Sequence, residues 1–113
     1  MNRVLNGFVF FDDTSTSQTS NPLANPNNAS TIVITVNGLE SAGGELSVEA
    51  LNDLSEKDTY FPVSAIGFGD YKIYSSITKD GIYAIPFEGL YRCRMVSSIA
   101  PGSFKVYGLS IEG

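Results

Sequence analysis

Residues 45–51 read Glu-Leu-Ser-Val-Glu-Ala-Leu, and this run decides the fold class of the chain. Its apolar residues alternate one by one with Glu45, Ser47 and Glu49. A β-strand points successive side chains to opposite faces, so this alternation is typical of a strand with one buried face and one solvated face. The run therefore predicts β structure.

Six further runs of β-branched and aromatic residues have the same character, and turn-forming residues separate them. They cover residues 31–36, 60–66, 71–78, 82–87, 90–98 and 103–111. Pro62 restricts its run to an edge or irregular strand, because proline cannot donate to the ladder. Only residues 50–55 offer a helical turn or two. Short strands in close succession predict an all-β fold, an antiparallel β-sandwich of jelly-roll type with about seven to eight strands.

Residues 2–11 form a stretch that is apolar on both faces when it is extended. Such a strand needs cover on both sides. The following residues, 12–30, are rich in Ser, Thr, Asn and Pro, and they bury too little apolar surface to repay the entropy of ordering them. Two interpretations stay open. Residues 2–11 are either a central strand of the chain's own sheet or an arm that docks on another polypeptide.

The second interpretation divides the chain into two parts. An N-terminal extended arm with a flexible polar linker covers residues 1–30, and a β-sandwich domain covers residues 31–113. The arm then supplies a protein interface made of Val4, Leu5, Phe8, Val9, Phe10 and Phe11. Burial of these side chains and addition of the arm to an exposed sheet edge would provide the binding energy.

Composition excludes several classes of function. The 113 residues suit one domain. A net charge of −5 without a basic stripe disfavours nucleic acid and anionic membrane surfaces as partners. The absence of histidine removes Ser–His and Cys–His catalysis, so we expect neither an enzyme nor a cofactor. Asp12-Asp13 stand where a signal peptide would carry small residues, so we expect synthesis in the cytoplasm without a signal peptide.

Three local features are weaker candidates for chemistry. One loop offers oxygen ligands suited to Ca²⁺, although their spacing favours a plain hydrated loop: Asn52, Asp53, Glu56 and Asp58. Several tyrosines could stack on a sugar, although packing at the edge of the core is favoured: Tyr60, Tyr71, Tyr74 and Tyr83. The single cysteine, Cys93, is expected to be a buried core thiol.

The C-terminal half carries a series of turn-and-strand patterns. They are Asp80-Gly81-Ile82-Tyr83, Glu88-Gly89-Leu90, Arg94-Met95-Val96-Ser97-Ser98, Pro101-Gly102-Ser103 and Val106-Tyr107-Gly108. In these patterns the chain resembles small β-sandwich proteins carried on the virions of tailed bacteriophages, such as head-decoration and fibre-type proteins. The resemblance implies a virion structural protein, in the first place a capsid decoration or accessory protein.

The same resemblance implies partners rather than substrates. The expected partners are other virion proteins, namely the major capsid protein or neighbouring copies in a homo-oligomer on the particle, and no catalytic residues are carried over. The expected location is the virion. A carbohydrate-binding β-sandwich module of a fibre or adhesin remains the alternative.

Overall fold

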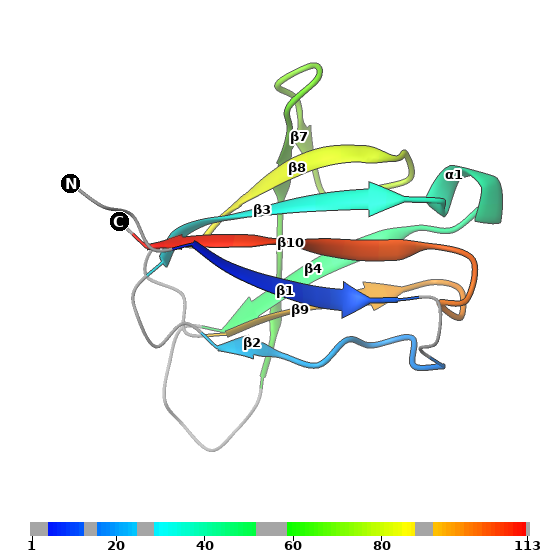
Figure 1. The fold of residues 1–113 in the computed structure, drawn as a ribbon, viewed down its shortest axis with the longest axis horizontal. Helices are drawn as coiled ribbons and strands as arrows, with labels where there is room; N and C mark the ends of the chain where they lie inside the picture. The colour runs from blue at the N-terminus through cyan, green and yellow to red at the C-terminus, as the bar shows by residue number, and fades with distance from the viewer. Residues whose placement is uncertain (1–4, 13–15, 25–28, 52–58, 88–91, 113) are drawn as a thin grey trace.

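Two antiparallel sheets packed face to face make up the protein (Figure 1). The computed structural model describes residues 5–12, 16–24, 29–51, 59–87 and 92–112. Every pairing between the described strands is antiparallel. Buried side chains from both sheets share one hydrophobic core. The all-β sandwich predicted from the sequence is therefore confirmed.

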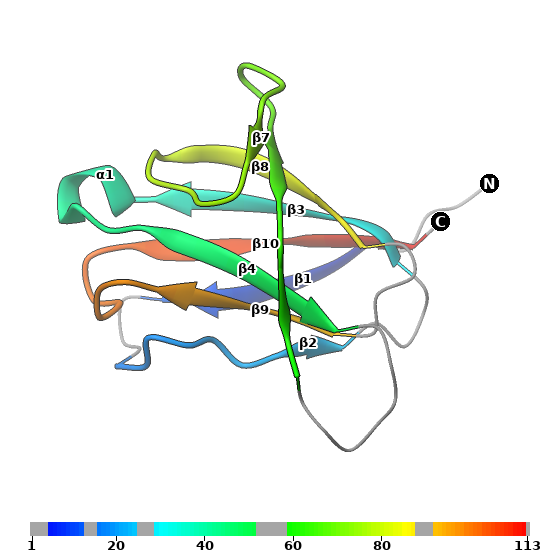
Figure 2. The same cartoon turned by 180° about the vertical axis from the view of Figure 1, so that it is seen from behind.

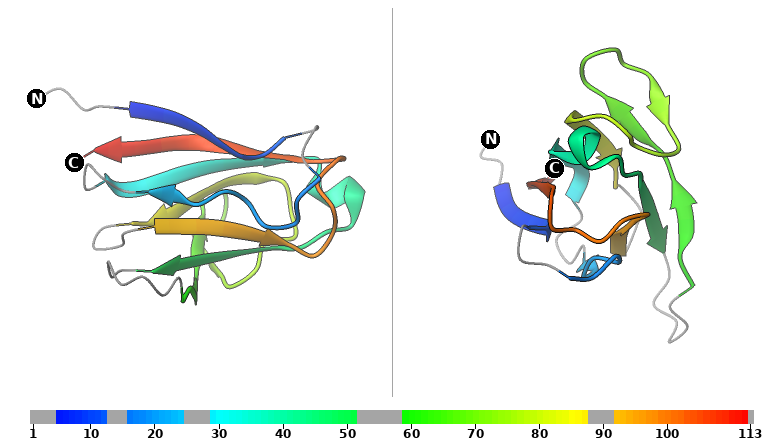
Figure 3. Two further views of the ribbon diagram at one scale, coloured as in Figure 1. Left: turned by 90° about the horizontal axis from the view of Figure 1, so that it is seen from below. Right: turned by 90° about the vertical axis from the view of Figure 1, so that its right-hand side faces the viewer.

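The six-stranded sheet has the order β1-β10-β3-β8-β6-β7. Its strands are β1 (Leu5–Phe11), β10 (Lys105–Glu112), β3 (Ala29–Asn37), β8 (Gly81–Pro86), β6 (Ala65–Gly67) and β7 (Ile73–Tyr74). The four-stranded sheet has the order β2-β9-β4-β5. Its strands are β2 (Leu23–Ala24), β9 (Arg92–Ser97), β4 (Leu46–Leu51) and β5 (Phe61–Val63). Figure 3 shows the two layers from two further directions.

The described residues form ten strands, more than the seven to eight predicted. One reason is that the run 60–66 serves both sheets. Residues 61–63 pair with β4, whereas residues 65–67 pair with β7 and β8 in the other sheet (Figure 2). Pro62 lies opposite Glu49 on the edge strand β5, in agreement with the expected restriction of proline to an edge strand.

A short helix, α1 (Leu39–Ala42), follows β3, and the sequence pattern does not predict it. The N-cap residue, Gly38, has no side chain to cap the helix. Asp80 supplies the cap from the turn before β8. Its carboxylate accepts hydrogen bonds from the N–H groups of Gly38 (3.0 Å), Leu39 (2.8 Å) and Glu40 (3.2 Å). The helical turn expected within residues 50–55 is not found at Ala50 and Leu51, which end β4, and the rest lies outside the described residues.

Residues 5–11 form the edge strand β1 of the chain's own sheet, which corrects the expectation of a separate arm over residues 1–30. β1 pairs with β10, and the register shifts between Val9 and Phe11. At such a bulge an extra residue enters one strand, so two successive side chains can turn to the same side. Phe10 and Phe11 are therefore both buried, and the Phe11 ring packs edge-to-face on Phe104 at 5.6 Å.

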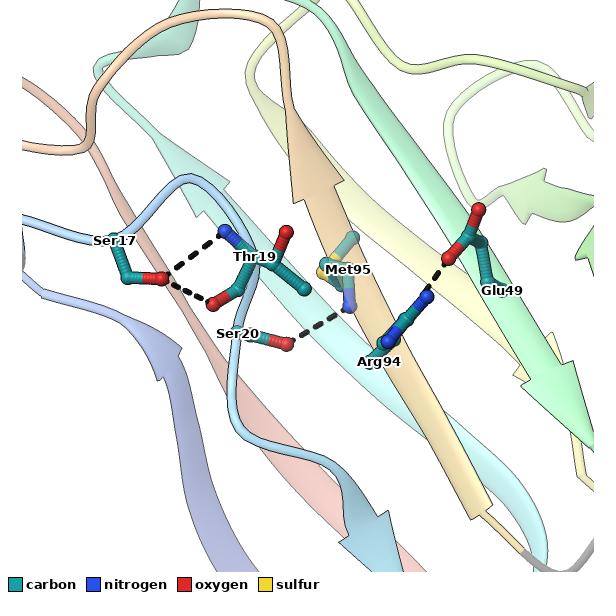
Figure 4. A network of polar contacts seen from close by, with 6 residues as sticks. All are labelled: Ser17, Thr19, Ser20, Glu49, Arg94 and Met95. Atoms are coloured by element: carbon teal, nitrogen blue, oxygen red, sulfur yellow. Dashed lines mark hydrogen bonds and ion pairs between the residues drawn. The ribbon is translucent and has the colours of Figure 1, made fainter. Parts of the chain in front are cut away.

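Residues 16–24 lie along β9, so this part of the predicted linker belongs to the four-stranded sheet. Ser20 is buried, its N–H donates to the carbonyl of Met95 (2.9 Å), and its Oγ accepts from the Met95 N–H (2.8 Å). The N–H of Ser97 donates to the carbonyl of Gln18 (2.8 Å). Figure 4 shows Ser20 and Met95 facing each other. Hydrogen bonds to β9 and the partial burial of Leu23 against the core offset the entropy of ordering this polar segment.

Candidate functional site

The outward side of the six-stranded sheet carries at least one apolar residue on every strand. In an antiparallel ladder, directly opposite residues point to the same face. One row runs across five strands as Leu109, Val33, Ala84, Ile66 and Ile73. The strand alternation places this row opposite the core, because its neighbours along β3 and β8 are buried. The row is therefore a surface feature of the whole sheet.

A second row lies beside the first on the same side of the sheet. It joins Val9, Tyr107, Thr35 and Ile82 across β1, β10, β3 and β8. Ile73, at 74%, and Val9, at 59%, are the most exposed members of the two rows. We call the apolar residues of both rows the apolar face: Val9, Val33, Ile66, Ile73, Ile82, Ala84, Tyr107 and Leu109.

The six strands carry little charge. Their one acidic residue is Glu112, which ends β10, although the chain has 12 acidic residues and a net charge of −5. Lys105 is the one basic residue in those strands, and it lies at the start of β10. Antiparallel sheets that face water usually alternate apolar inward with polar outward residues. The outward positions here break that rule on several strands at once.

The loop between β6 and β7 carries two further exposed aromatic side chains. It stands clear of the sandwich in Figures 1 and 2. Phe68 and Tyr71 in this loop are exposed, Tyr71 by 77%. Tyr71 has φ 57°, a left-handed conformation that few non-glycine residues adopt. The hydrogen bond from its N–H to the carbonyl of Gly67 (2.9 Å) closes the turn.

The outward side of the four-stranded sheet has the opposite character. Its strands and the adjoining segment place Thr19, Ser47, Glu49 and Arg94 outward, with the apolar Val96 between Ser47 and Thr19, and we call the four polar residues the polar face. The Arg94 Nε donates to the Glu49 Oε1 at 2.9 Å, as Figure 4 shows. The Arg94 guanidinium also lies 3.9 Å from the ring centroid of Tyr60. The charges of Arg94 and Glu49 are therefore paired with one another.

The predicted interface residues fall in different places. Phe10 and Phe11 are in the core, and Phe8 is partly buried against it. Val9 is exposed and belongs to the apolar face. Val4 lies outside the described residues, and Leu5 is described only through its backbone pairing with Ile111.

The remaining residues of the apolar face were missed by the reasoning from sequence. A signal for them exists. Residues 32–34 and 82–85 are continuous apolar runs, which implies apolar side chains on both faces of β3 and β8. Residues 2–11 have the same property.

The other candidate residues from the sequence give weaker support for a functional site. Cys93 is buried as predicted, and burial raises the pKa of its thiol to about 12. Tyr74 and Tyr83 meet edge-to-face at 5.7 Å, whereas Tyr60 lies against Arg94. The calcium candidates at residues 52–58 lie outside the described residues. Among those that are described, no three His, Cys, Asp or Glu residues gather as metal ligands, and no helix is long and apolar enough to cross a membrane.

The fold recurs in solved structures of prophage proteins. The sequence matches no protein-family profile and no curated protein. The SPBc2 prophage-derived protein YomS superposes with a TM-score of 0.80 over 98% of this chain and 96% of its own, at 15% identity. The PBSX exported protein XepA also gives a TM-score of 0.80 over 98% of this chain, at 18% identity, but the match spans only 39% of XepA. At these identities the likeness establishes the β-sandwich fold, the architecture that the resemblance to phage proteins implied.

Proposed function

We propose that this protein is a structural protein of a bacteriophage particle, a capsid decoration or accessory protein that binds other virion proteins through its apolar face. The observation that carries the proposal is the continuous apolar row from Leu109 to Ile73 across five strands. Exposed apolar patches of this kind on soluble proteins usually mark interaction sites. The prophage origin of two proteins with this fold supports the phage assignment.

The size of the apolar face favours a partner with many equivalent sites. Six strands spaced by about 4.8 Å and two rows of side chains give a footprint of roughly 300 Å². Its burial contributes about 7 kcal/mol before association costs of about 4–15 kcal/mol are subtracted. A single contact of this kind is weak. A repeating particle surface offsets that weakness when neighbouring copies bind side by side, because linked contacts reinforce one another.

The edge of β1 provides a second contact between neighbouring copies. β1 is the outermost strand of the six-stranded sheet among the described residues, so one side of its backbone is open for pairing. Val9 lies on this strand and on the apolar face. A neighbouring chain that adds a strand at β1 would lengthen the sheet and the apolar face together.

The chemistry of the apolar face argues for a protein partner. Contact with nucleic acid or anionic lipid draws its affinity from clustered Lys and Arg side chains. In the described strands of this sheet Lys105 is the sole basic residue. A flat apolar protein surface is the complement that this face requires.

A binding experiment with charged variants tests the proposal. Particles are prepared from the phage or prophage that carries the gene, with the gene deleted, and incubated with purified protein. Sedimentation and quantitative mass spectrometry then measure the copies bound per particle. The variant Ile73→Lys with Leu109→Lys places two charges on the apolar face and should reduce binding about tenfold or more.

A matched variant separates this effect from a change in net charge. Thr19→Lys with Ser47→Lys adds the same two charges on the polar face and should bind like the unmodified protein. Thermal unfolding followed by circular dichroism shows that both variants remain folded. Unchanged binding of the apolar-face variant, or no binding of the unmodified protein to the particles, overturns the proposal.

A further inference from the structure

A small cavity lies where the turns around β7 meet the start of β8. It measures about 270 Å³, and Asp70, Tyr74, Lys79, Asp80, Ile82 and Tyr83 line it. Sites for drug-sized ligands usually measure roughly 300–1,000 Å³. The cavity therefore suits a ligand of about one ring.

The carboxylate of Asp70 is held in place on one wall of this cavity. Its Oδ1 accepts a hydrogen bond from the Lys72 N–H (3.0 Å), and its Oδ2 accepts one from the Tyr74 hydroxyl. Gly67 leaves the room for this arrangement, because a Cβ there would lie 2.7 Å from the Asp70 Oδ1 and 3.0 Å from the Tyr74 Cε2. The hydrogen bond from Tyr74 is the main cause that lowers the pKa of Asp70. The carboxylate is ionised and oriented before any ligand arrives.

The hydroxyl groups of Tyr74 and Tyr83 already donate hydrogen bonds within the chain. The Tyr74 hydroxyl donates to Asp70, and the Tyr83 hydroxyl donates to the carbonyl of Lys79 (2.7 Å). Burial, with added effects of the carboxylates of Asp70, Asp80 and Glu40, raises the pKa of Tyr83. The polar wall thus presents mainly acceptor oxygens, and a ligand must donate hydrogen bonds to it.

The rest of the cavity supplies a donor and an apolar wall. The ammonium group of Lys79 is a strong donor with no acceptor capacity. Ile82 adds an exposed aliphatic side chain, and the rings of Tyr74 and Tyr83 add aromatic carbon. The cavity thus combines oriented acceptors, one donor and an apolar wall in a space of about one ring. This combination suits a small ligand that has both polar groups and an apolar side.

We propose that this cavity binds a single neutral sugar ring, such as a terminal hexose of a glycan. The hydroxyl groups of a pyranose donate to Asp70 and accept from Lys79, while its C–H groups pack on Ile82 and the tyrosines. Asp70, Asp80 and Lys79 line the cavity, so its lining carries a net negative charge that disfavours acidic sugars. This site shares Ile82 with the apolar face, but the sugar binding does not rest on the particle binding proposed above.

Nuclear magnetic resonance titration of the full-length protein tests the site directly. Galactose, glucose and N-acetylglucosamine serve as neutral probes, and N-acetylneuraminic acid serves as the acidic probe. At least one neutral sugar should give saturable shifts of the amides of residues 67–83, with a Kd of about 1–10 mM, the range of a weak single-ring ligand. The acidic sugar should give none at the same concentrations.

Three variants locate the binding. Asp70→Asn and Lys79→Ala should each weaken binding about tenfold. Asp70→Asn could also disturb the turn, so Lys79→Ala serves as an independent variant of the cavity. Tyr107→Ala, on the apolar face, should leave the affinity unchanged. No saturable shift with any neutral sugar up to roughly 100 mM, stronger binding of the acidic sugar, or equal binding by both cavity variants and the unmodified protein overturns the proposal.

Discussion

The two outward faces of the sandwich are built on the same plan and carry opposite chemistry. On the four-stranded sheet the buried residues of β4 alternate with Ser47 and Glu49, as solubility requires. On the six-stranded sheet the buried residues of β3 alternate with Thr31, Val33 and Thr35, and the apolar Val33 continues a row of apolar residues on neighbouring strands. Folding constrains only the inward positions of each strand. The outward positions are free to vary, so an apolar choice repeated across five strands indicates a use outside the fold.

The two faces also differ in how their side chains are held. Arg94 on the polar face contacts both Glu49 and Tyr60, so its charge is satisfied within the chain. Leu109 and Ile73 on the apolar face point away from the core and remain 43% and 74% exposed. The charges of Arg94 and Glu49 on the polar face already have partners within the chain. Covering the apolar face with another surface, in contrast, lowers the free energy.

The largest change in the free energy of unfolding is expected in β1, which has residues both in the core and on the apolar face. Phe11→Ala should lower the free energy of unfolding by about 3–5 kcal/mol, because it empties a core position that is 1% exposed. Val9→Ala, two residues earlier on the apolar face, should cost about 1 kcal/mol or less. Urea denaturation followed by circular dichroism measures both. Similar losses for the two variants would mean that β1 does not divide core from face as described.

A smaller effect is expected where the polar segment joins β9. Ser20→Ala removes the buried oxygen that accepts the Met95 N–H and should cost about 1–3 kcal/mol, since that N–H is then left without this partner. Thr19→Ala, at an exposed neighbouring position, serves as the control and should change stability by about 0.5 kcal/mol or less. The same denaturation experiment applies. A negligible loss for Ser20→Ala would show that residues 16–24 add little to the four-stranded sheet.

The sequence predicts what depends on near neighbours and misses what depends on register. Strand β4 and the burial of Cys93 follow from local alternation. The bulge that turns both Phe10 and Phe11 inward depends on pairing with Val106, almost 100 residues away in the chain. The cap on α1 could not be read from local sequence, and the apolar runs 32–34 and 82–85 give only part of the apolar face. The first needs Asp80, 41 residues from Leu39, and the second is assembled by cross-strand pairs.

Apolar residues on both faces of a strand indicate an exposed apolar surface, but the sequence alone does not show which strand keeps that surface exposed. Apolar character on both faces drew attention to residues 2–11, and the structure accounts for most of that character by the bulge and the core. Residues 32–34 have the same character without a bulge in their pairing to β8. Their second apolar side is therefore left facing outward. Only the pairing register distinguishes these two cases.

The smallest effect is expected on the polar face itself. Arg94 and Glu49 are 31% and 27% exposed at the side chain, so water and salt screen their attraction. A double-mutant cycle with Arg94→Gln and Glu49→Gln should give a coupling energy of about 0.5 kcal/mol that falls as salt is raised. Unfolding in urea at low and high ionic strength measures it. A coupling of several kcal/mol would make this pair a structural element, and the contrast between a plainly solvated face and a binding face would then no longer hold.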